Sequence, residues 1–216
     1  PGKVTAEFET KIANLFGKKR GLFVNSGSSA NLLALEIHQF PKGSEVITPA
    51  CNFNTTVAPI VQTGLVPVFI DVEMGKYALD PSALEKALSK KTAAVMAPHL
   101  IGNFIDLPKI HSFCKKHGLV FIEDSCDTIG GSFRDKPSGV WSDITTTSFY
   151  ASHIITAGGA GGMLMINDKK LREKARVFRD WGRGISRHDE KIRSRLAAFK
   201  IDKRPYDSAF AFVERG

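Results

Sequence analysis

The sequence predicts an α/β fold, a three-layer α/β/α sandwich with a mostly parallel sheet. Short apolar runs alternate along the chain with amphipathic stretches, and strands that alternate with helices form right-handed crossovers between parallel strands. The runs are continuously apolar, as expected of strands covered by helices on both faces. With 216 residues, the chain is long enough for one large domain with its own core.

The expected elements follow in chain order. A helical pattern at residues 6–15 comes first, and four strand–helix pairs follow it. These pairs are strand 21–24 with helix 30–38, strand 45–48 with helix 54–62, strand 66–70 with helix 81–88, and strand 93–96 with helix 107–117. A fifth apolar run lies at 119–122. After Asp124 the alternation loosens, and we expect two more strands, at 145–150 and 162–166, and a basic helix at 169–181.

Charge and composition narrow the function classes. Lys and Arg number 30 against 22 acids, a net charge of +8, and such a surface attracts anionic ligands. The basic excess is heaviest at 183–204, and the sequence has neither an aromatic-interleaved basic stripe nor zinc-finger spacing. We therefore expect no nucleic-acid partner.

The cysteines and the ends of the chain indicate where the protein acts. Cys51, Cys114 and Cys126 form no CxxC pair and no Cys/His metal pattern, so we expect no metal site and a reducing compartment. No signal peptide is visible, and no apolar run approaches the roughly 20 residues that cross a bilayer. We expect a cytoplasmic protein without a membrane partner. The start without Met and the apolar end at 210–216 predict a fragment of a longer protein.

The first candidate site follows the first strand, because ligands of open α/β sheets lie at the carboxyl ends of strands. Residues 25–30 place Gly27, Ser28 and Ser29 at a helix start, where free N–H groups and hydroxyls suit a phosphate. The alternative is an ordinary helix N-cap, for which serine is also favoured.

Two later strands also end in candidate site residues. Asp124, Cys126 and Asp127 follow the fifth strand, although acids there are often solvated loop residues. His153 follows the strand at 145–150, where a histidine can be structural or catalytic. The glycines at 158–162 allow either close approach to a ligand or a tight hairpin.

Taken together, these segments resemble one family from about Phe8 to Trp181. Residues 25–31 (Asn-Ser-Gly-Ser-Ser-Ala-Asn), 48–56, 98–103 and 123–127 (Glu-Asp-Ser-Cys-Asp) are similar, in order, to motifs of the DegT/DnrJ/EryC1/StrS aminotransferases and dehydratases. The resemblance implies the large domain of a PLP-dependent transferase (aspartate aminotransferase-like), with pyridoxal 5′-phosphate or pyridoxamine 5′-phosphate as cofactor. It also implies a nucleotide-sugar substrate and a homodimer.

The resemblance implies that four side chains contact the cofactor's pyridine ring. Asp124 would pair with the pyridine nitrogen and strengthen the ring as an electron sink. Phe53 would lie on one ring face and Cys126 on the other, while Asp127 stands where many members carry Gln or His near the ring hydroxyl. Core packing is the alternative role for Phe53.

The same resemblance assigns the phosphate to the first site. Ser28 and Ser148 would hold it, together with N–H groups near Gly27 and Ser29.

His153 separates this chain from the family's aminotransferases. These carry a lysine five residues after the serine that matches Ser148, and the lysine bonds covalently to the cofactor; here that position is His153. The substitution is typical of the family's sugar 3-dehydratases, and the run 148–156 is similar to theirs. An imidazole cannot form the lysine's bond but can move protons near neutral pH, so His153 is expected to be the catalytic base.

Two kinds of 3-dehydratase are possible. One carries an iron–sulfur cluster, and a reductase partner with it, on cysteines after an Asp-Trp-Gly-Arg segment. Residues 184–207 contain no cysteine, which favours the cluster-free, colitose-pathway kind. Residues 1–216 would then be the cofactor-binding large domain, without the family's small C-terminal domain. An aminotransferase scaffold that has lost its lysine, or a non-enzymatic relative, remain the alternatives.

Overall fold

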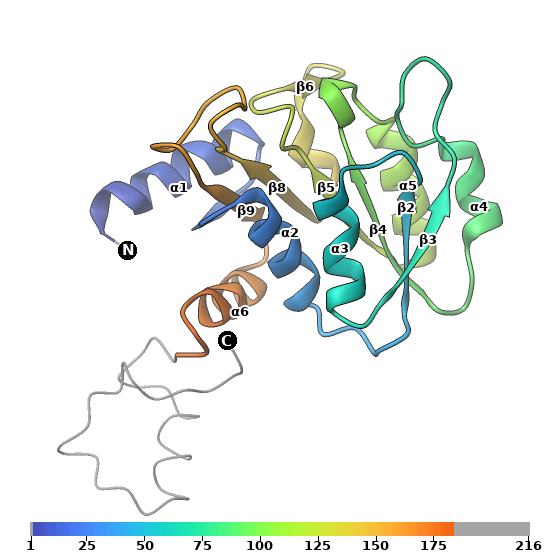
Figure 1. Ribbon diagram of the computed structural model, residues 1–216, viewed down its shortest axis with the longest axis horizontal. Coiled ribbons are helices and arrows are strands. Elements are labelled where there is room, and N and C mark those ends of the chain that lie inside the picture. The colour runs from blue at the N-terminus through green and yellow to red at the C-terminus, as the bar shows by residue number, and fades with distance from the viewer. Residues whose placement is uncertain (1, 184–216) are drawn as a thin grey trace, which may run out of the picture.

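A computed structural model describes residues 2–183, which form one seven-stranded sheet between two layers of helices, as well as a small hairpin (Figure 1). From edge to edge, the strands are β1 (Arg20–Val24), β9 (Gly162–Ile166), β8 (Ile144–Ser148), β5 (Val120–Asp124), β4 (Thr92–Pro98), β2 (Glu45–Pro49) and β3 (Val66–Ile70).

Within this sheet one strand, β9, runs against the others. β3, β2, β4, β5 and β8 pair in parallel, and β9 pairs antiparallel with both β8 and β1. β1 therefore points the same way as β8, although it comes from the other end of the domain. The three-layer, mostly parallel α/β architecture expected from the sequence is confirmed.

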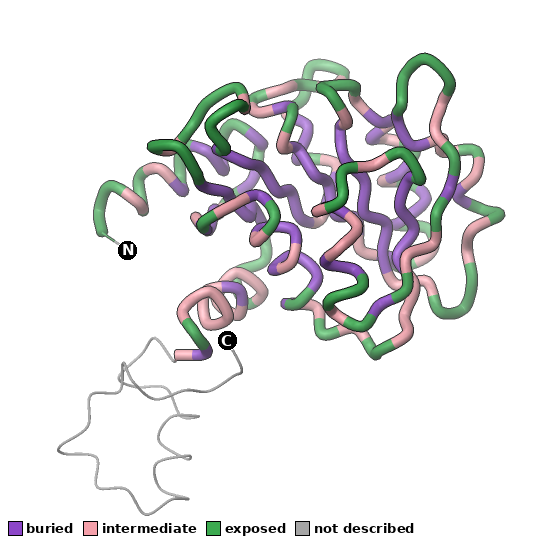
Figure 2. The backbone as a smooth tube through the Cα atoms, viewed as in Figure 1, coloured by how far each residue is buried: buried purple, intermediate pink, exposed green. Residues whose placement is uncertain are grey.

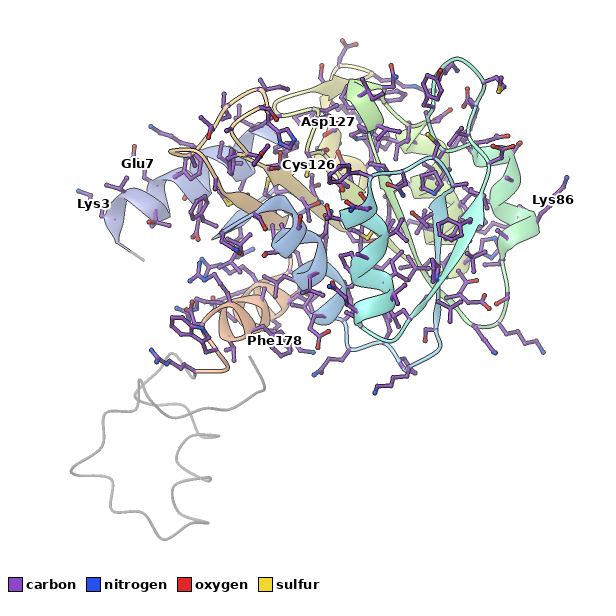
Figure 3. All side chains as sticks on the ribbon, viewed as in Figure 1. Lys3, Glu7, Lys86, Cys126, Asp127 and Phe178 are labelled. Atoms are coloured by element: carbon purple, nitrogen blue, oxygen red, sulfur yellow. The ribbon has the colours of Figure 1, made fainter. Side chains whose placement is uncertain are left out.

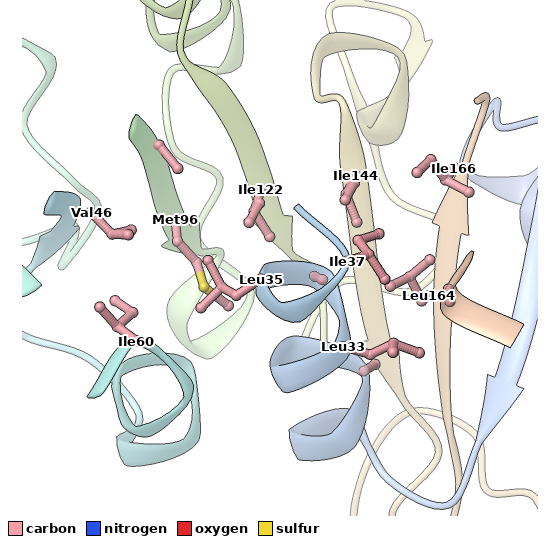
Figure 4. Close-up of a cluster of buried hydrophobic side chains, with 14 of the residues drawn as sticks. Leu33, Leu35, Ile37, Val46, Ile60, Met96, Ile122, Ile144, Leu164 and Ile166 are labelled. Atoms are coloured by element: carbon pink, nitrogen blue, oxygen red, sulfur yellow. The ribbon is translucent and has the colours of Figure 1, made fainter. Parts of the chain in front are cut away.

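The helices divide between the two faces of the sheet. α2 (Gly27–Glu36), α3 (Asn54–Gln62) and α6 (Lys169–Arg179) cover one face, and α1 (Lys3–Leu15), α4 (Leu84–Ala87) and α5 (Leu107–His117) cover the other. Successive side chains of a strand point to opposite faces of the sheet, so each strand contributes to the hydrophobic core on both faces. Ile122 and Leu164 belong to the same buried cluster as Leu33 and Leu35 of α2 (Figure 4), whereas Phe121 and Met163 belong to the clusters of the opposite face.

Burial follows this layering. Figure 2 shows the buried stretches concentrated in the strands and in the helix faces that cover them. Complete burial of one Leu or Ile side chain contributes roughly 1.5–3 kcal/mol, so the many fully buried side chains of both faces make the sheet a rigid platform for its loops. Within residues 2–183, no helix combines the length and the apolar character needed to cross a membrane.

Local chemistry sets the ends of elements and explains departures from the expected bounds. The Ser26 hydroxyl accepts the Ser29 N–H, so α2 begins at Gly27, earlier than expected. The helix expected at 81–88 is instead a 3-10 turn, η1 (Pro81–Ala83), followed by the short α4. β8 ends at Ser148 rather than at 150, because the Ser148 hydroxyl accepts the Tyr150 N–H.

Four short elements were not expected from the sequence. β6 (Ser132–Phe133) and β7 (Lys136–Pro137) form the small antiparallel hairpin, and η2 (Leu100–Gly102) and η3 (Ser138–Trp141) are 3-10 turns.

Candidate active site

A cavity of about 450 Å³ opens at the carboxyl ends of the parallel strands. Loops after β1, β2, β4, β5 and β8 all contribute to it, as the rule for open α/β sheets requires. It brings together eight of the nine predicted site residues: Gly27, Ser28, Phe53, Asp124, Cys126, Asp127, Ser148 and His153. Ser29, the ninth, does not line the cavity.

Asp124, the last residue of β5, is 4% exposed and lines the cavity. Its Oδ2 accepts hydrogen bonds from Asn31 Nδ2 at 2.8 Å and from Thr56 Oγ1 at 2.7 Å, and its Oδ1 accepts the Cys126 N–H at 3.2 Å. Three donors that converge on one buried carboxylate fix its position. The side chain is therefore ready to meet a cationic group in the cavity.

Asn31 and Thr56 were missed by the sequence analysis. Asn31 is 1% exposed within α2, and its amide oxygen accepts Thr146 Oγ1 at 2.6 Å. Thr56 is fully buried in the first turn of α3. The only signal in the sequence was an Asn amid the apolar residues of a predicted helix, because buried polar side chains need partners.

The start of α2 forms another wall of the cavity. Ser26 caps the helix, and its hydroxyl also bonds the Ser29 hydroxyl at 3.1 Å, which directs Ser29 toward the cap. Ser28 is exposed and lines the cavity, while Ser148 is 6% exposed and faces it from β8. The free N–H groups and the positive end of the helix dipole make this wall suitable for an anion.

Glycine allows these walls to meet. A Cβ at Gly27 would lie 2.8 Å from Ser148 Cβ and 2.9 Å from Cys126 Sγ. Gly27 is thus required for close packing of the helix start against the loop after β5 and the end of β8, which is a more specific role than the helix cap alone.

Phe53 and Cys126 present apolar surface to the cavity. Phe53 is 62% exposed, so the core-packing role is wrong for it. Burial, reinforced by the Asp124 carboxylate, raises the pKa of the Cys126 thiol well above its usual range. Cys126 therefore remains an uncharged thiol at neutral pH and contributes contact area, not a nucleophile.

His153 lies in the loop between β8 and β9. Its Nε2 is 3.8 Å from Asp127 Oδ1, and its Nδ1 is buried without a hydrogen-bond partner among residues 2–183. Figure 3 shows Asp127 next to Cys126 just beyond β5. The glycine run at 158–162 ends the long loop 149–161 between the antiparallel strands β8 and β9, in which Ser148 pairs with Gly162, so the two strands pair as a hairpin but the expected tight turn does not form.

A second buried carboxylate supports the cavity from below. Glu123 is fully buried and accepts hydrogen bonds from His99 Nε2 at 3.0 Å and Ser125 Oγ at 2.7 Å. Burial alone would raise the pKa of Glu123, but the hydrogen bonds from His99 and its other partners outweigh burial and lower the pKa to about 2. His99 itself lines the cavity, so its hydrogen bond to Glu123 connects the buried core to the cavity wall.

The comparisons with known proteins agree with this geometry. The DegT/DnrJ/EryC1/StrS aminotransferase family matches residues 1–202. This chain is 43% identical over 184 residues to the dTDP-4-dehydro-2,6-dideoxy-D-glucose 3-dehydratase of Saccharopolyspora spinosa, covering 82% of this chain and 40% of that protein. It is 40% identical over 190 residues to the lipopolysaccharide biosynthesis protein RfbH of Salmonella typhimurium, covering 84% and 43%. Another relative is named as a sugar 3-aminotransferase.

Solved structures give the same result. The E. coli GDP-4-keto-6-deoxy-D-mannose-3-dehydratase with bound hydrated PLP matches with a TM-score of 0.86 and 27% identity, covering 100% of this chain and 56% of that one. The chain thus spans about half the length of these proteins, or less. From the family match and the identities, the chain belongs to the DegT/DnrJ/EryC1/StrS aminotransferase family.

Proposed function

We propose that this chain is the cofactor-binding domain of a vitamin-B6-dependent enzyme that removes the C3 hydroxyl of a 4-keto-6-deoxy nucleotide sugar, in deoxysugar or lipopolysaccharide biosynthesis. The observation that carries the proposal is His153, which occupies the position of the family's covalent lysine and lines the cavity together with Asp124. Relatives named as 3-dehydratases support it.

The residues of the cavity fit pyridoxal or pyridoxamine phosphate. The exposed ring of Phe53 and the uncharged thiol of Cys126 offer two apolar surfaces to a flat ring. Asp124, held by three donors, suits a protonated pyridine nitrogen. Ser28 and Ser148 flank the start of α2, where the phosphate would bind.

The chemistry then divides between cofactor and protein. The cofactor, when bound, supplies an electron sink that makes loss of the C3 hydroxyl possible. Asp124 would keep that sink cationic by holding the proton on the ring nitrogen. His153 would take up a proton at an imidazole nitrogen. A general base of this kind raises the rate of the reaction by about 10²–10⁴-fold.

The alternative is an aminotransferase scaffold that has lost its lysine. The residues on either side of His153 argue against it, because they match the dehydratase pattern: Phe149, Tyr150, Ile155 and Thr156. A single Lys→His change in an aminotransferase would have left the aminotransferase residues around that position. The cysteine-free segment 184–207, on which the cluster-free assignment rests, lies outside the described residues.

Mass spectrometry of the products tests the proposal. The full-length protein is incubated with excess pyridoxamine phosphate and a panel of 4-keto-6-deoxy sugar nucleotides, and the expected product is the 3-deoxy ketone, lighter than the sugar by one oxygen atom, formed as the pyridoxamine phosphate is converted to pyridoxal phosphate and ammonia. His153→Asn is the matched control and should keep cofactor binding while turnover falls by about 10²–10⁴-fold. Turnover at the parent rate in His153→Asn would reject His153 as the base. An amino sugar formed instead with PLP and an amino donor would support an aminotransferase.

Two further expectations belong to this proposal. The full-length protein is proposed to be a homodimer, because the family's sites lie at a dimer interface and closed two-fold dimers are the commonest soluble oligomers. A cytoplasmic location also remains a prediction.

A further inference from the structure

The Asp127 carboxylate connects two parts of the cavity wall. Its Oδ2 accepts the backbone N–H of Ile101 at 3.0 Å, and its Oδ1 lies 3.8 Å from His153 Nε2. One oxygen is therefore fixed by the backbone, while the other faces the imidazole. The resemblance alone had assigned Asp127 to the cofactor's ring hydroxyl, with no link to His153.

The backbone that fixes Asp127 is strained. Ile101 has φ 56° and ψ 30°, the left-handed region, which is rare for a β-branched residue. Its side chain is 75% exposed, so burial does not explain the conformation. Strain of this kind persists only where the surrounding structure enforces it, and it concentrates at functional sites. Here the left-handed turn directs the Ile101 N–H toward Asp127.

The turn is anchored in the core. The Gly102 N–H donates to the His99 carbonyl at 3.1 Å, and the His99 N–H donates to the Asp124 carbonyl at 3.0 Å. The His99 ring pairs with the buried Glu123. Asp127 is thus held, through Ile101, by the same hydrogen bonds that fix the floor of the cavity.

We propose that Asp127 is a positioning residue that orients the His153 imidazole and stabilises its protonated form after the ring has accepted a proton. The proposal deepens the dehydratase function proposed above, and its catalytic meaning rests on that function. Among residues 2–183, Asp127 is the acid whose carboxylate lies within 4.0 Å of an imidazole nitrogen of His153. The other titratable side chains that line the cavity are His99, Cys126 and Tyr150, of which Cys126 is uncharged at neutral pH and Tyr150 forms an edge contact with His153 at 6.0 Å.

The first test needs no catalysis. The imidazole signals of the full-length, cofactor-free protein are followed by NMR over a pH series, and the His153 signal is identified by its loss in His153→Asn. Asp127→Asn keeps an oxygen that can accept the Ile101 N–H but removes the charge, so the midpoint of the His153 titration should move to lower pH. Asp127→Glu, which restores the charge, should move it back. An unchanged midpoint in Asp127→Asn and in a second neutral variant, Asp127→Ser, would overturn the proposal.

The second test uses turnover. Two charges about 4 Å apart in water interact strongly enough to change an equilibrium about fivefold, and more where water is excluded. We expect Asp127→Asn to lower turnover by about five- to fiftyfold, to shift the acidic limb of the pH–rate profile to lower pH, and to add nothing in a His153→Asn background. An additive loss with an unmoved profile would refute the positioning role. If no variant and no parent dehydrates while the NMR midpoint shifts, the proposed function fails and the pairing of Asp127 with His153 stands.

Discussion

Glu123 should give the fold a specific response to acid. It is fully buried, and its carboxylate accepts hydrogen bonds from His99, Ser125, Ser142 and Thr145. Because these bonds outweigh the effect of burial, its pKa falls from 4.5 to about 2 in the folded state. A carboxyl with a lowered folded-state pKa stabilises the protein above its unfolded-state pKa, and this stabilisation is lost as the pH falls toward the folded-state value.

The size of the effect follows from the two pKa values. The difference between 4.5 and about 2 corresponds to about 3 kcal/mol at neutral pH, and about 2 kcal/mol of this should be lost by pH 3. Glu123→Gln cannot ionise and cannot show this loss. The difference in unfolding free energy between parent and Glu123→Gln should therefore shrink by about 2 kcal/mol between pH 6 and pH 3.

Urea unfolding at pH 6, 5, 4 and 3 measures this difference. Glu36→Gln, which changes an exposed glutamate of α2, is the control and should follow the parent at every pH. If parent and Glu123→Gln lose stability in parallel from pH 6 to pH 3, folding does not lower the pKa of Glu123 and the reasoning is wrong.

The remaining predictions concern the cavity and assembly. Borohydride should fix no cofactor to the parent chain but should fix it in His153→Lys, as peptide mass spectrometry will show; a lysine adduct near the site in the parent would contradict this. Asp124→Asn should weaken cofactor binding about ten- to hundredfold in a fluorescence titration, since a charge-assisted bond is lost; an equal Kd would exclude the assigned pairing. Gly27→Ala should lower the unfolding free energy by about 1–3 kcal/mol, because the new methyl group would meet Ser148 and Cys126, and a stability equal to the parent's would show that the loops yield. Light scattering should report a dimer of the full-length protein, and a stable, active monomer would rule this out.

Much of the fold could be predicted because the strands have continuous apolar runs. The β6–β7 hairpin and the direction of β9 were not predicted, because neither leaves a signal in the apolar pattern. The β6–β7 hairpin turns through Arg134 (φ 51°) and Asp135 (φ 60°), so the turn has two left-handed residues and no glycine or Asn-Gly signal. The antiparallel direction of β9 could not be read, because the linking segment 149–161 is long enough for either direction.

The sequence located most of the residues of the candidate site but not the hydrogen bonds between them. Strand ends located Asp124 and His153, but the side-chain partners of Asp124, Asn31 and Thr56, come from the helices after β1 and β2, which only the folded topology brings together. Ser29 was expected to face the phosphate, yet its hydroxyl bonds to the Ser26 cap, because the helix starts at Gly27, three residues earlier than the sequence suggested. Successive residues of a helix point about 100° apart around its axis. An error in the predicted first residue of the helix therefore changes the direction in which each serine is expected to point.

The position of β9 has a consequence for the order of synthesis. β1 pairs with the rest of the sheet through β9 alone, so the strand that leads into the start of α2 has no neighbouring strand until residues 162–166 have left the ribosome. Contacts this distant along the chain form late, since the loop they close is long. A nascent chain shorter than Ile166 would contain Asp124 and Ser28 without a cavity to join them. Cofactor capture is therefore expected only after nearly the whole of the described domain has been translated.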